Sequence, residues 1–350
     1  MSASGKILLR LLFAGLGVAL VAYLVGRIGF DAIATHLDGV GFGFAWMVLA
    51  YAAGTVVCAL PWYWLLPRYA RPRVRGAITS RFAAAGANAV LPFVSIGGEP
   101  TRLLWLTPPH RAVGLAGVVV DRLLFGVASV VFLLIGLVTA LFLAALPTPY
   151  AVASAALALG ALVAAAAGAW VAANYGIARR IHKLVRRFRG AQTAELARGA
   201  LGDGVDERLV QLLKGRRDRL VGGATVHLFG RVLLGAELYV GLIVVGVPVS
   251  PAEGVVLASV PVVVGIVGSW IPSQIGVQEG AVAIVCGLLG IDPAAGVSVV
   301  VLQRIRQIGT VTLAWALISR RAGAASRRAS PAAKPAPERS GERLEDEPSS

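Results

Sequence analysis

The sequence predicts an all-α, polytopic helical membrane protein with two inverted repeats, each containing a broken, re-entrant helical hairpin. Hydrophobic residues make up 57% of the 350 residues and charged residues only 15%, whereas soluble domains carry about 25% charged residues. Six apolar runs reach or approach the roughly 20 residues that a helix needs to cross the hydrocarbon core. They lie at Ile7–Val25, Phe42–Leu66, Ala112–Leu146, Tyr150–Ala173, Val221–Val247 and Ala294–Ile318. Two further apolar stretches, around 77–97 and 252–290, are interrupted by Gly, Pro and polar residues.

The positive charge is concentrated just outside the apolar runs, in a chain whose net charge is +15. Lys and Arg form four clusters, at 68–75, 179–189, 216–219 and 320–328. The short loops at 27–39 and 147–149 carry only one such residue between them. This asymmetry is the positive-inside pattern of a multi-pass protein of the cytoplasmic membrane, and it places the N- and C-termini in the cytoplasm. A basic surface for nucleic acid is not indicated.

The predicted transmembrane domain covers residues 1–318. Its parts are repeat one at about 42–173, a cytoplasmic insertion at 176–220 and repeat two at about 221–318. The first apolar run is predicted to be a retained span, because no small-residue cleavage pattern follows it before Arg27. Cys58 and Cys286 lie in apolar segments, which predicts two separate buried thiols rather than a disulfide or a metal site.

Two segments are predicted to lie outside the membrane core. In the insertion, the apolar residues of 177–188 recur at helical spacing with basic residues on the other face. Such a helix either lies on an anionic leaflet or only extends a membrane helix and fixes its topology. The tail at 319–350 is rich in Ala, Pro, Ser, Arg and Glu without apolar periodicity, so it is predicted to be disordered.

The topology follows from the two basic loops at 67–76 and 176–220, which must be joined by an even number of crossings. The simplest solution makes 77–97 part of a hairpin that enters from the cytoplasm and returns there. By the same argument, the broken stretch at 252–290 enters from the opposite side and returns. An alternative, in which both arms of each hairpin cross the full membrane, is not separated from this one by periodicity.

The two broken stretches resemble each other. In Leu91–Glu99 and in Ile271–Glu279, a Pro precedes a Glu by seven residues, with Ile-Gly between them. Arg122 follows the first Glu by 23 residues and Arg304 follows the second by 25, in both cases inside the next apolar run. Inverted repeats with interrupted helices are the architecture of many secondary transporters, whose binding sites lie at the interruptions.

Proline and glycine supply the predicted helix breaks. Proline lacks an amide hydrogen, and glycine tolerates dihedral angles that end a helix. The predicted break residues are Pro92, Gly97, Gly98, Pro272 and Gly276. Backbone groups freed in this way are tolerated within the membrane only beside protein or a wet cavity. The breaks therefore predict a cavity.

Polar side chains in or beside the apolar stretches are the candidate substrate-binding residues. A single charge at a helix centre costs about 2.5–3.5 kcal/mol on insertion scales, so these groups need partners or water. The candidates are Glu99, Arg102, Arg122, Glu279, Arg304, Arg231, Glu237, Arg81 and Asn88. In one reading, Glu99 pairs with Arg122 and Glu279 with Arg304 only to lock the helices together. In the other, the arginines hold a lipid phosphate, which suits their planar fork, and the glutamates bind a cation or proton.

Arg231 and Glu237 lie on one predicted helix and each needs a partner from elsewhere. The sequence offers Glu99 for Arg231 and Arg304 for Glu237. No metal-ligand cluster and no nucleophile with an adjacent base is recognisable, so we expect neither a metal, nor a cofactor, nor a catalytic residue. The absence of a Walker-type loop argues against ATP hydrolysis by this chain.

These residues also carry a family resemblance. The Gly97–Arg102 and Val118–Leu124 runs resemble the first signature of the flippase-like integral membrane family, which includes the transmembrane half of lysylphosphatidylglycerol synthetases. The second signature is similar to Pro272–Gly280 followed by Leu302–Arg304. The resemblance covers roughly residues 7–318 and implies a lipid-translocating protein, with substrates such as aminoacylated phosphatidylglycerol, hopanoids or other polar lipids.

The chain departs from that family in two respects. The synthetases carry a soluble aminoacyl-transferring domain after the membrane part, so aminoacyl transfer is not expected here. The second repeat also has Gln-Arg where the first has Asp-Arg, so the two sites are not expected to have equal roles. The leading hypothesis is a flippase for a polar or anionic membrane lipid. The alternatives are an accessory subunit of a lipid or glycan biosynthetic system, or a membrane enzyme acting on lipid headgroups with Glu99 or Glu279 as base.

Overall fold

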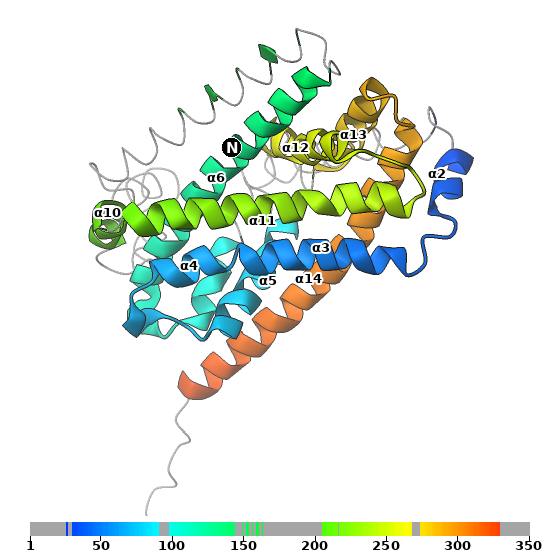
Figure 1. Ribbon diagram of the computed structural model, residues 1–350. Helices are drawn as coiled ribbons and strands as arrows, with labels where there is room; N and C mark the ends of the chain where they lie inside the picture. The colour runs from blue at the N-terminus through cyan, green and yellow to red at the C-terminus, as the bar shows by residue number, and fades with distance from the viewer. Residues whose placement is uncertain are drawn as a thin grey trace, which may run out of the picture.

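The protein is a bundle of helices in the computed structural model (Figure 1). The structure describes residues 30–90, 98–143, 205–215, 217–267 and 274–329, with isolated positions at 26 and between 149 and 163. The elements are α2 (Phe30–Leu37), α3 (Gly43–Val57), α4 (Leu60–Leu65), η1 (Arg68–Ala70), α5 (Val74–Val90), η2 (Glu99–Trp105), η3 (Pro108–His110), α6 (Arg111–Phe142), α10 (Val205–Gly215), α11 (Arg217–Val244), α12 (Pro251–Val267), α13 (Val277–Leu288) and α14 (Pro293–Ala329). The predicted all-α class is confirmed.

Three described segments are long and apolar enough to cross a membrane, namely Gly43–Leu65, Pro108–Phe142 and Arg217–Val244. They coincide with three of the six predicted spans. In the first, a separate helix, α4, begins at Leu60 with Pro61 in its first turn, because proline cannot continue the hydrogen bonding of α3. The predicted span at 294–318 lies within α14, whose centre contains two Arg and two Gln between 303 and 307. The run at 7–25 and most of 150–173 are outside the described residues.

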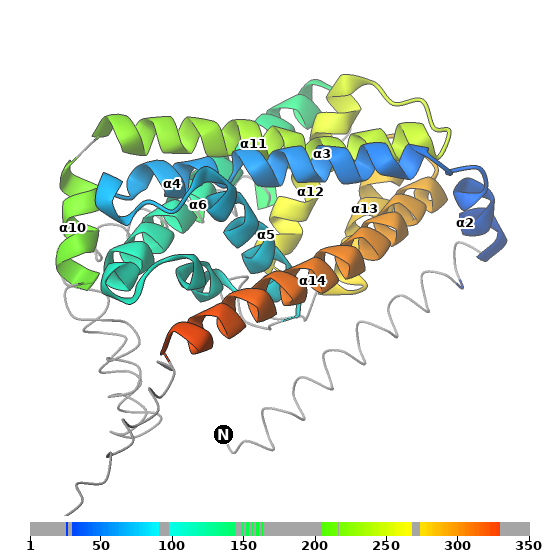
Figure 2. The same ribbon diagram turned by 90° about the horizontal axis from the view of Figure 1, so that it is seen from below.

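The first helices of the two predicted repeats, α3–α4 and α11, lie side by side and run in opposite directions (Figures 1 and 2). Glycines allow this close approach. A Cβ atom on Gly54 would lie 2.8 Å from Leu234, and one on Gly230 would lie 2.5 Å from the Cys58 sulfur. Small residues at helix contacts are typical of membrane proteins. Antiparallel first helices are what inverted copies require, and the inversion of the complete repeats stays a prediction.

The two broken hairpins start from opposite ends of the bundle. At one end, the ring of His36 contacts Asp292 (3.0 Å) and the Val245 carbonyl (3.5 Å), close to where α12 begins and α13 ends. The hydrogen bonds from His36 and from the Ala294 amide lower the pKa of Asp292. At the other end, the ring of Tyr69 lies at a tilt against that of His110, with centroids 5.5 Å apart, close to where α5 begins and η2 ends. Whether each hairpin is re-entrant or crosses the full membrane stays a prediction.

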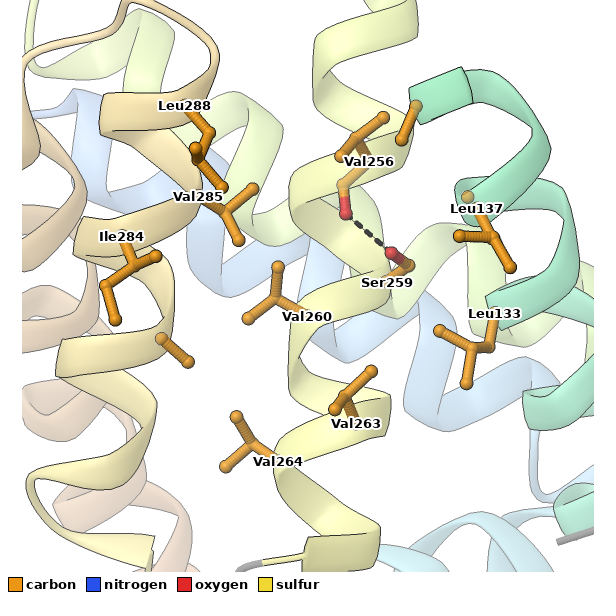
Figure 3. Close-up of a pocket in the computed structure, with 13 residues that line it drawn as sticks. Leu133, Leu137, Val256, Ser259, Val260, Val263, Val264, Ile284, Val285 and Leu288 are labelled. Carbon is orange, nitrogen blue, oxygen red and sulfur yellow. Dashed lines mark hydrogen bonds between the residues drawn. The ribbon is translucent and has the colours of Figure 1, made fainter. Parts of the chain in front are cut away.

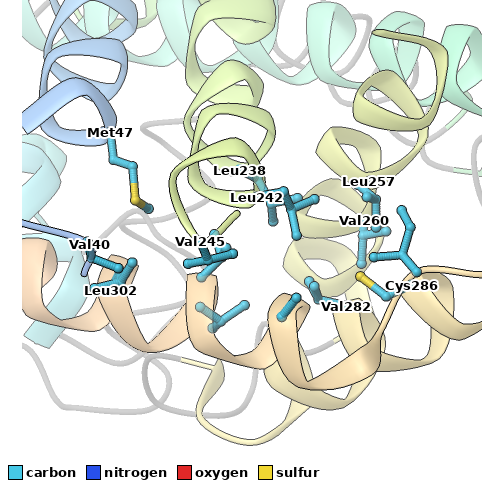
Figure 4. Packing of buried hydrophobic residues seen from close by; sticks show 14 of the residues in the cluster. Val40, Met47, Leu238, Leu242, Val245, Leu257, Val260, Val282, Cys286 and Leu302 are labelled. Atoms are coloured by element: carbon cyan, nitrogen blue, oxygen red, sulfur yellow. The ribbon is translucent and has the colours of Figure 1, made fainter. Parts of the chain in front are cut away.

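The largest hydrophobic core joins α3 and α11 to the second hairpin and α14 (Figure 4). Met47, Leu242, Leu257 and Val282 are almost completely buried there. Cys286 belongs to the same core, and both it and Cys58 are buried free thiols. The prediction that each cysteine is a small hydrophobic residue in helix packing is confirmed.

The boundaries of the predicted tail and insertion need correction. Helix α14 continues to Ala329, so the tail does not begin at Ser319. The extra turns are rich in Ala and Arg, which favour helices. At the end of the insertion, residues 217–220 already belong to α11. Within it, α10 buries Val205 and Leu209 against α6. The predicted amphipathic segment at 177–188 and residues 330–350 are outside the described residues.

Candidate functional site

A buried carboxylate, Glu99, forms the centre of the first of two charged clusters. It begins η2, and only 1% of its side chain is exposed. Its Oε1 atom lies 3.2 Å from Arg81 Nη1 and 3.3 Å from Arg122 Nε. Its Oε2 atom accepts a hydrogen bond from Arg102 Nη1 at 3.1 Å. One carboxylate thus contacts guanidinium groups from α5, η2 and α6.

The cluster continues through Arg102 to two residues that were not predicted as site residues. Arg102 Nη1 also donates to Asp121 Oδ2 at 2.7 Å, and His227 Nε2 lies 2.9 Å from Asp121 Oδ1. All three side chains are fully buried. Two sequence signals could have found them: Asp121 precedes Arg122 directly, and His227 is one helical turn before Arg231. The result is a continuous charged network from Glu99 to α11.

An amide clamp holds the two arms of the first hairpin together. Asn88 in α5 donates from Nδ2 to Glu99 Oε1 (3.2 Å) and accepts at Oδ1 from the backbone amide of Gly98 (2.7 Å). The clamp requires glycine at position 98. A Cβ atom there would lie 2.5 Å from the Ala84 carbonyl oxygen and 2.7 Å from the backbone nitrogen of Asn88. Asn88 and Gly98 thus connect the two arms of the first hairpin.

Replacing Gly98 by Ala should separate the two arms, because the new methyl group would collide with backbone atoms that cannot rotate away. We expect a loss of about 1–3 kcal/mol of stability, as for other overpacked sites. Thermal unfolding of the purified protein in detergent measures it. Gly126→Ala in α6 is the matched control, since nothing lies within 4 Å of the added atom. Equal melting temperatures for both variants would contradict this account of the clamp.

The second cluster surrounds Glu279 at the start of α13. Gly276 precedes that helix with a φ of +81°, a conformation that favours glycine, and its amide donates to Glu279 Oε2 at 2.8 Å. The other carboxylate oxygen accepts from Arg304 Nε at 2.9 Å. Beside this pair, Gln278 donates to Gln303 at 3.0 Å. The pairings of Glu99 with Arg122 and of Glu279 with Arg304, expected from the repeat, are both present.

The suggested partner of Glu237 was wrong. Glu237 pairs with Arg306 rather than with Arg304. Arg304 is already bound to Glu279, and residues two apart on a helix point in different directions. Arg306 also lies over the ring of Tyr51 in α3, 3.6 Å from its centroid.

The predicted candidates therefore fall into two clusters. The first contains Arg81, Asn88, Glu99, Arg102 and Arg122, together with Arg231, which lies against the same Phe125 ring as Arg81 and Arg122. The second contains Glu237, Glu279 and Arg304. Within the described part of the chain, no hydrogen bond or ion pair joins the clusters, and Arg231 does not pair with Glu99. In both, the arginine shared by the repeats is the more accessible partner: the exposed side-chain fraction is 20% for Arg122 and 23% for Arg304, against 1% and 6% for their glutamates. The break residues Pro92, Gly97 and Pro272 are outside the described residues.

An apolar groove of about 270 Å³ lies between α6, α12 and α13 (Figure 3). Leu133 and Leu137 form one wall, Val260 and Val264 the floor, and Ile284 the opposite side. Its one polar side chain, Ser259, bonds to the Val256 carbonyl at 2.6 Å. A groove whose polar groups are satisfied internally suits a hydrocarbon ligand.

Comparison with protein families identifies the family of the chain. The family model described as lysylphosphatidylglycerol synthase TM region matches residues 7–314. The chain belongs to this family. The match spans the residues of both charged clusters and of the groove, and the predicted family resemblance is confirmed. No curated protein sequence and no solved structure matches the chain significantly.

Proposed function

We propose that this protein moves a polar or anionic lipid between the leaflets of the cytoplasmic membrane. The observation that carries the proposal is the first charged cluster, in which guanidinium groups surround Glu99 inside a bundle of apolar helices. Buried charges of this kind are costly and mark substrate pathways in membrane proteins. The family relates the chain to membrane lipids in general, and the movement between leaflets is our inference.

Charged groups inside the bundle can lower the free-energy barrier to moving a lipid headgroup through the membrane. A lipid phosphate cannot cross hydrocarbon alone, because an unpaired charge in a medium of low dielectric constant is strongly disfavoured. Arginine offers the phosphate two parallel hydrogen bonds and a full positive charge. A headgroup that contacts Arg122 would exchange water for these donors.

The apolar groove offers an acyl chain a place between helices that also carry charged residues. Two helices that carry charged residues also line the groove. Leu133 lies about 16 Å beyond Arg122 along the axis of α6, and Ala281 lies about 3 Å beyond Glu279 along the axis of α13. The volume of about 270 Å³ is near the lower limit of small-ligand pockets. It therefore suits one acyl chain rather than a complete lipid.

Leaflet exchange in vesicles tests this function. The purified protein is reconstituted with phosphatidylglycerol carrying a dithionite-sensitive fluorophore, and dithionite is added outside. We expect fluorescence of the inner leaflet to be lost faster than in protein-free vesicles and in vesicles with an unrelated helical membrane protein. An exchange rate equal to both controls, with the protein shown to be folded, would refute the proposal.

A further inference from the structure

Three guanidinium groups from three helices converge on a single phenyl ring in the first cluster. The Cζ atoms of Arg81, Arg122 and Arg231 lie 5.4, 5.5 and 5.7 Å from the centroid of Phe125. The ring faces can attract these cations, and the imidazole of His227 contacts the same ring edge to face at 5.4 Å. Three guanidinium groups thus lie around Phe125, whose uncharged ring does not neutralise their positive charges.

The carboxylates do not balance this positive charge. The first cluster has four guanidinium groups, those of Arg81, Arg102, Arg122 and Arg231, but its only carboxylates among the described residues are Glu99 and Asp121. Two positive charges are therefore in excess. The second cluster is balanced, since two arginines are paired with two glutamates. An uncompensated buried charge is unfavourable by several kcal/mol, so the excess in the first cluster requires a reason.

Hydrogen-bond donors without partners also indicate that the first cluster has too few negatively charged acceptors. Arg102 is fully buried, yet its Nε and Nη2 atoms have no hydrogen-bond partner, and neither has the buried Nε atom of Arg231. Buried donors without partners are rare in folded proteins. Both carboxylates of the cluster are already bound to other members, with Glu99 contacting three arginines and Asp121 contacting Arg102 and His227. The described carboxylates therefore offer these donors no further acceptor.

We propose that the first cluster is a binding site for one phosphate group, with Arg231 as its main uncompensated cation and Phe125 at its base. The phosphate could come from two sources, the phosphodiester of a lipid headgroup or free inorganic phosphate. Only the first source rests on the proposed function. Guanidinium groups match the geometry of phosphate oxygens. The balanced second cluster is not a phosphate site, so the two repeats have different roles.

Binding to the purified full chain in detergent tests the site without any transport step. Thermal unfolding is followed while inorganic phosphate, dioctanoyl phosphatidylglycerol or the phosphate-free dioctanoylglycerol is titrated. We expect both phosphate compounds to raise the melting temperature and Arg231→Gln to weaken their binding roughly tenfold to hundredfold, as for loss of a charged hydrogen bond. Arg217→Gln, at the exposed start of the same helix, removes the same charge and should bind like the wild type.

The melting temperature without ligand excludes a merely structural role. If Arg231 carries uncompensated charge, Arg231→Gln should melt at a higher temperature than the wild type while losing the response to phosphate. Arg231→Lys should keep the charge but bind phosphate more weakly, because lysine lacks the planar fork.

The two phosphate sources are distinguished by competition. Displacement of phosphate by the lipid supports the lipid headgroup, and a response to phosphate alone supports the free ion. Wild-type affinity for both compounds in Arg231→Gln overturns the site, even if leaflet exchange is observed. If the site is confirmed but exchange is absent, the proposed function fails and the binding site stands.

Discussion

Asp121→Asn should destabilise the protein by about 3–5 kcal/mol, the usual cost of removing one partner from a buried ion pair. Asp121 is fully buried and accepts from Arg102 at 2.7 Å while contacting His227 at 2.9 Å. Asparagine has the same shape but no charge, and its amide group offers only one accepting oxygen. The variant would therefore leave a cluster with three uncompensated guanidinium groups instead of two.

Chemical or thermal unfolding in detergent measures this loss, with Asp292→Asn as the control. Asp292 also binds a histidine, His36, at 3.0 Å, but 54% of its side chain is exposed. An exposed pair contributes only about 0–1 kcal/mol, so the control should be close to the wild type. If Asp121→Asn were as stable as Asp292→Asn, the network would not be held together by its charges.

Local sequence features predicted much of the fold. Apolar runs of sufficient length identify spans, and the interrupted stretches indicated the two hairpins because Pro and Gly affect the backbone wherever they occur. The internal repeat went further and predicted contacts. The same Glu-to-Arg spacing occurs twice, and both Glu99 with Arg122 and Glu279 with Arg304 are in contact.

Contacts between distant helices could not be predicted in this way. The pair of Glu237 and Arg306 spans 69 residues and that of Asp121 and His227 spans 106. Each depends on how two helices are rotated against one another, which their periodicity does not determine. The same limit applies to the division of the charged residues into two clusters, because it depends on the relative position of the two hairpins.

One sequence difference between the repeats explains much of their different chemistry. Asp121 in the first repeat occupies the place of Gln303 in the second. The aspartate binds Arg102 and His227, whereas the glutamine accepts from Gln278 at 3.0 Å. A charged acceptor draws in a further arginine and a histidine, and a neutral one does not need them. The departure from the repeat pattern thus coincides with the departure from charge balance.

Glu99→Gln should bind a phosphate-bearing lipid more tightly and transport it more slowly. In the structure, Glu99 Oε1 contacts Arg81 and Arg122, which are two of the cations assigned to the phosphate. The carboxylate and the phosphate therefore compete for the same donors. Glutamine can still accept from Asn88 but competes weakly for a guanidinium group, because a charged hydrogen bond contributes about 1.5–3 kcal/mol. We expect roughly tenfold tighter binding.

Slower transport follows from the same competition. A carrier must release its substrate. When no carboxylate competes for the guanidinium groups, the bound anion dissociates slowly. We expect leaflet exchange to fall by at least the factor by which binding tightens, about tenfold. Both quantities are measured on monodisperse protein, with Glu253→Gln as the control, since Glu253 binds Ser250 at the start of α12. Weaker binding with normal exchange would mean that Glu99 positions the arginines instead of competing for them. Tighter binding with slower exchange has no such structural explanation, because a distorted site would lose affinity and rate together.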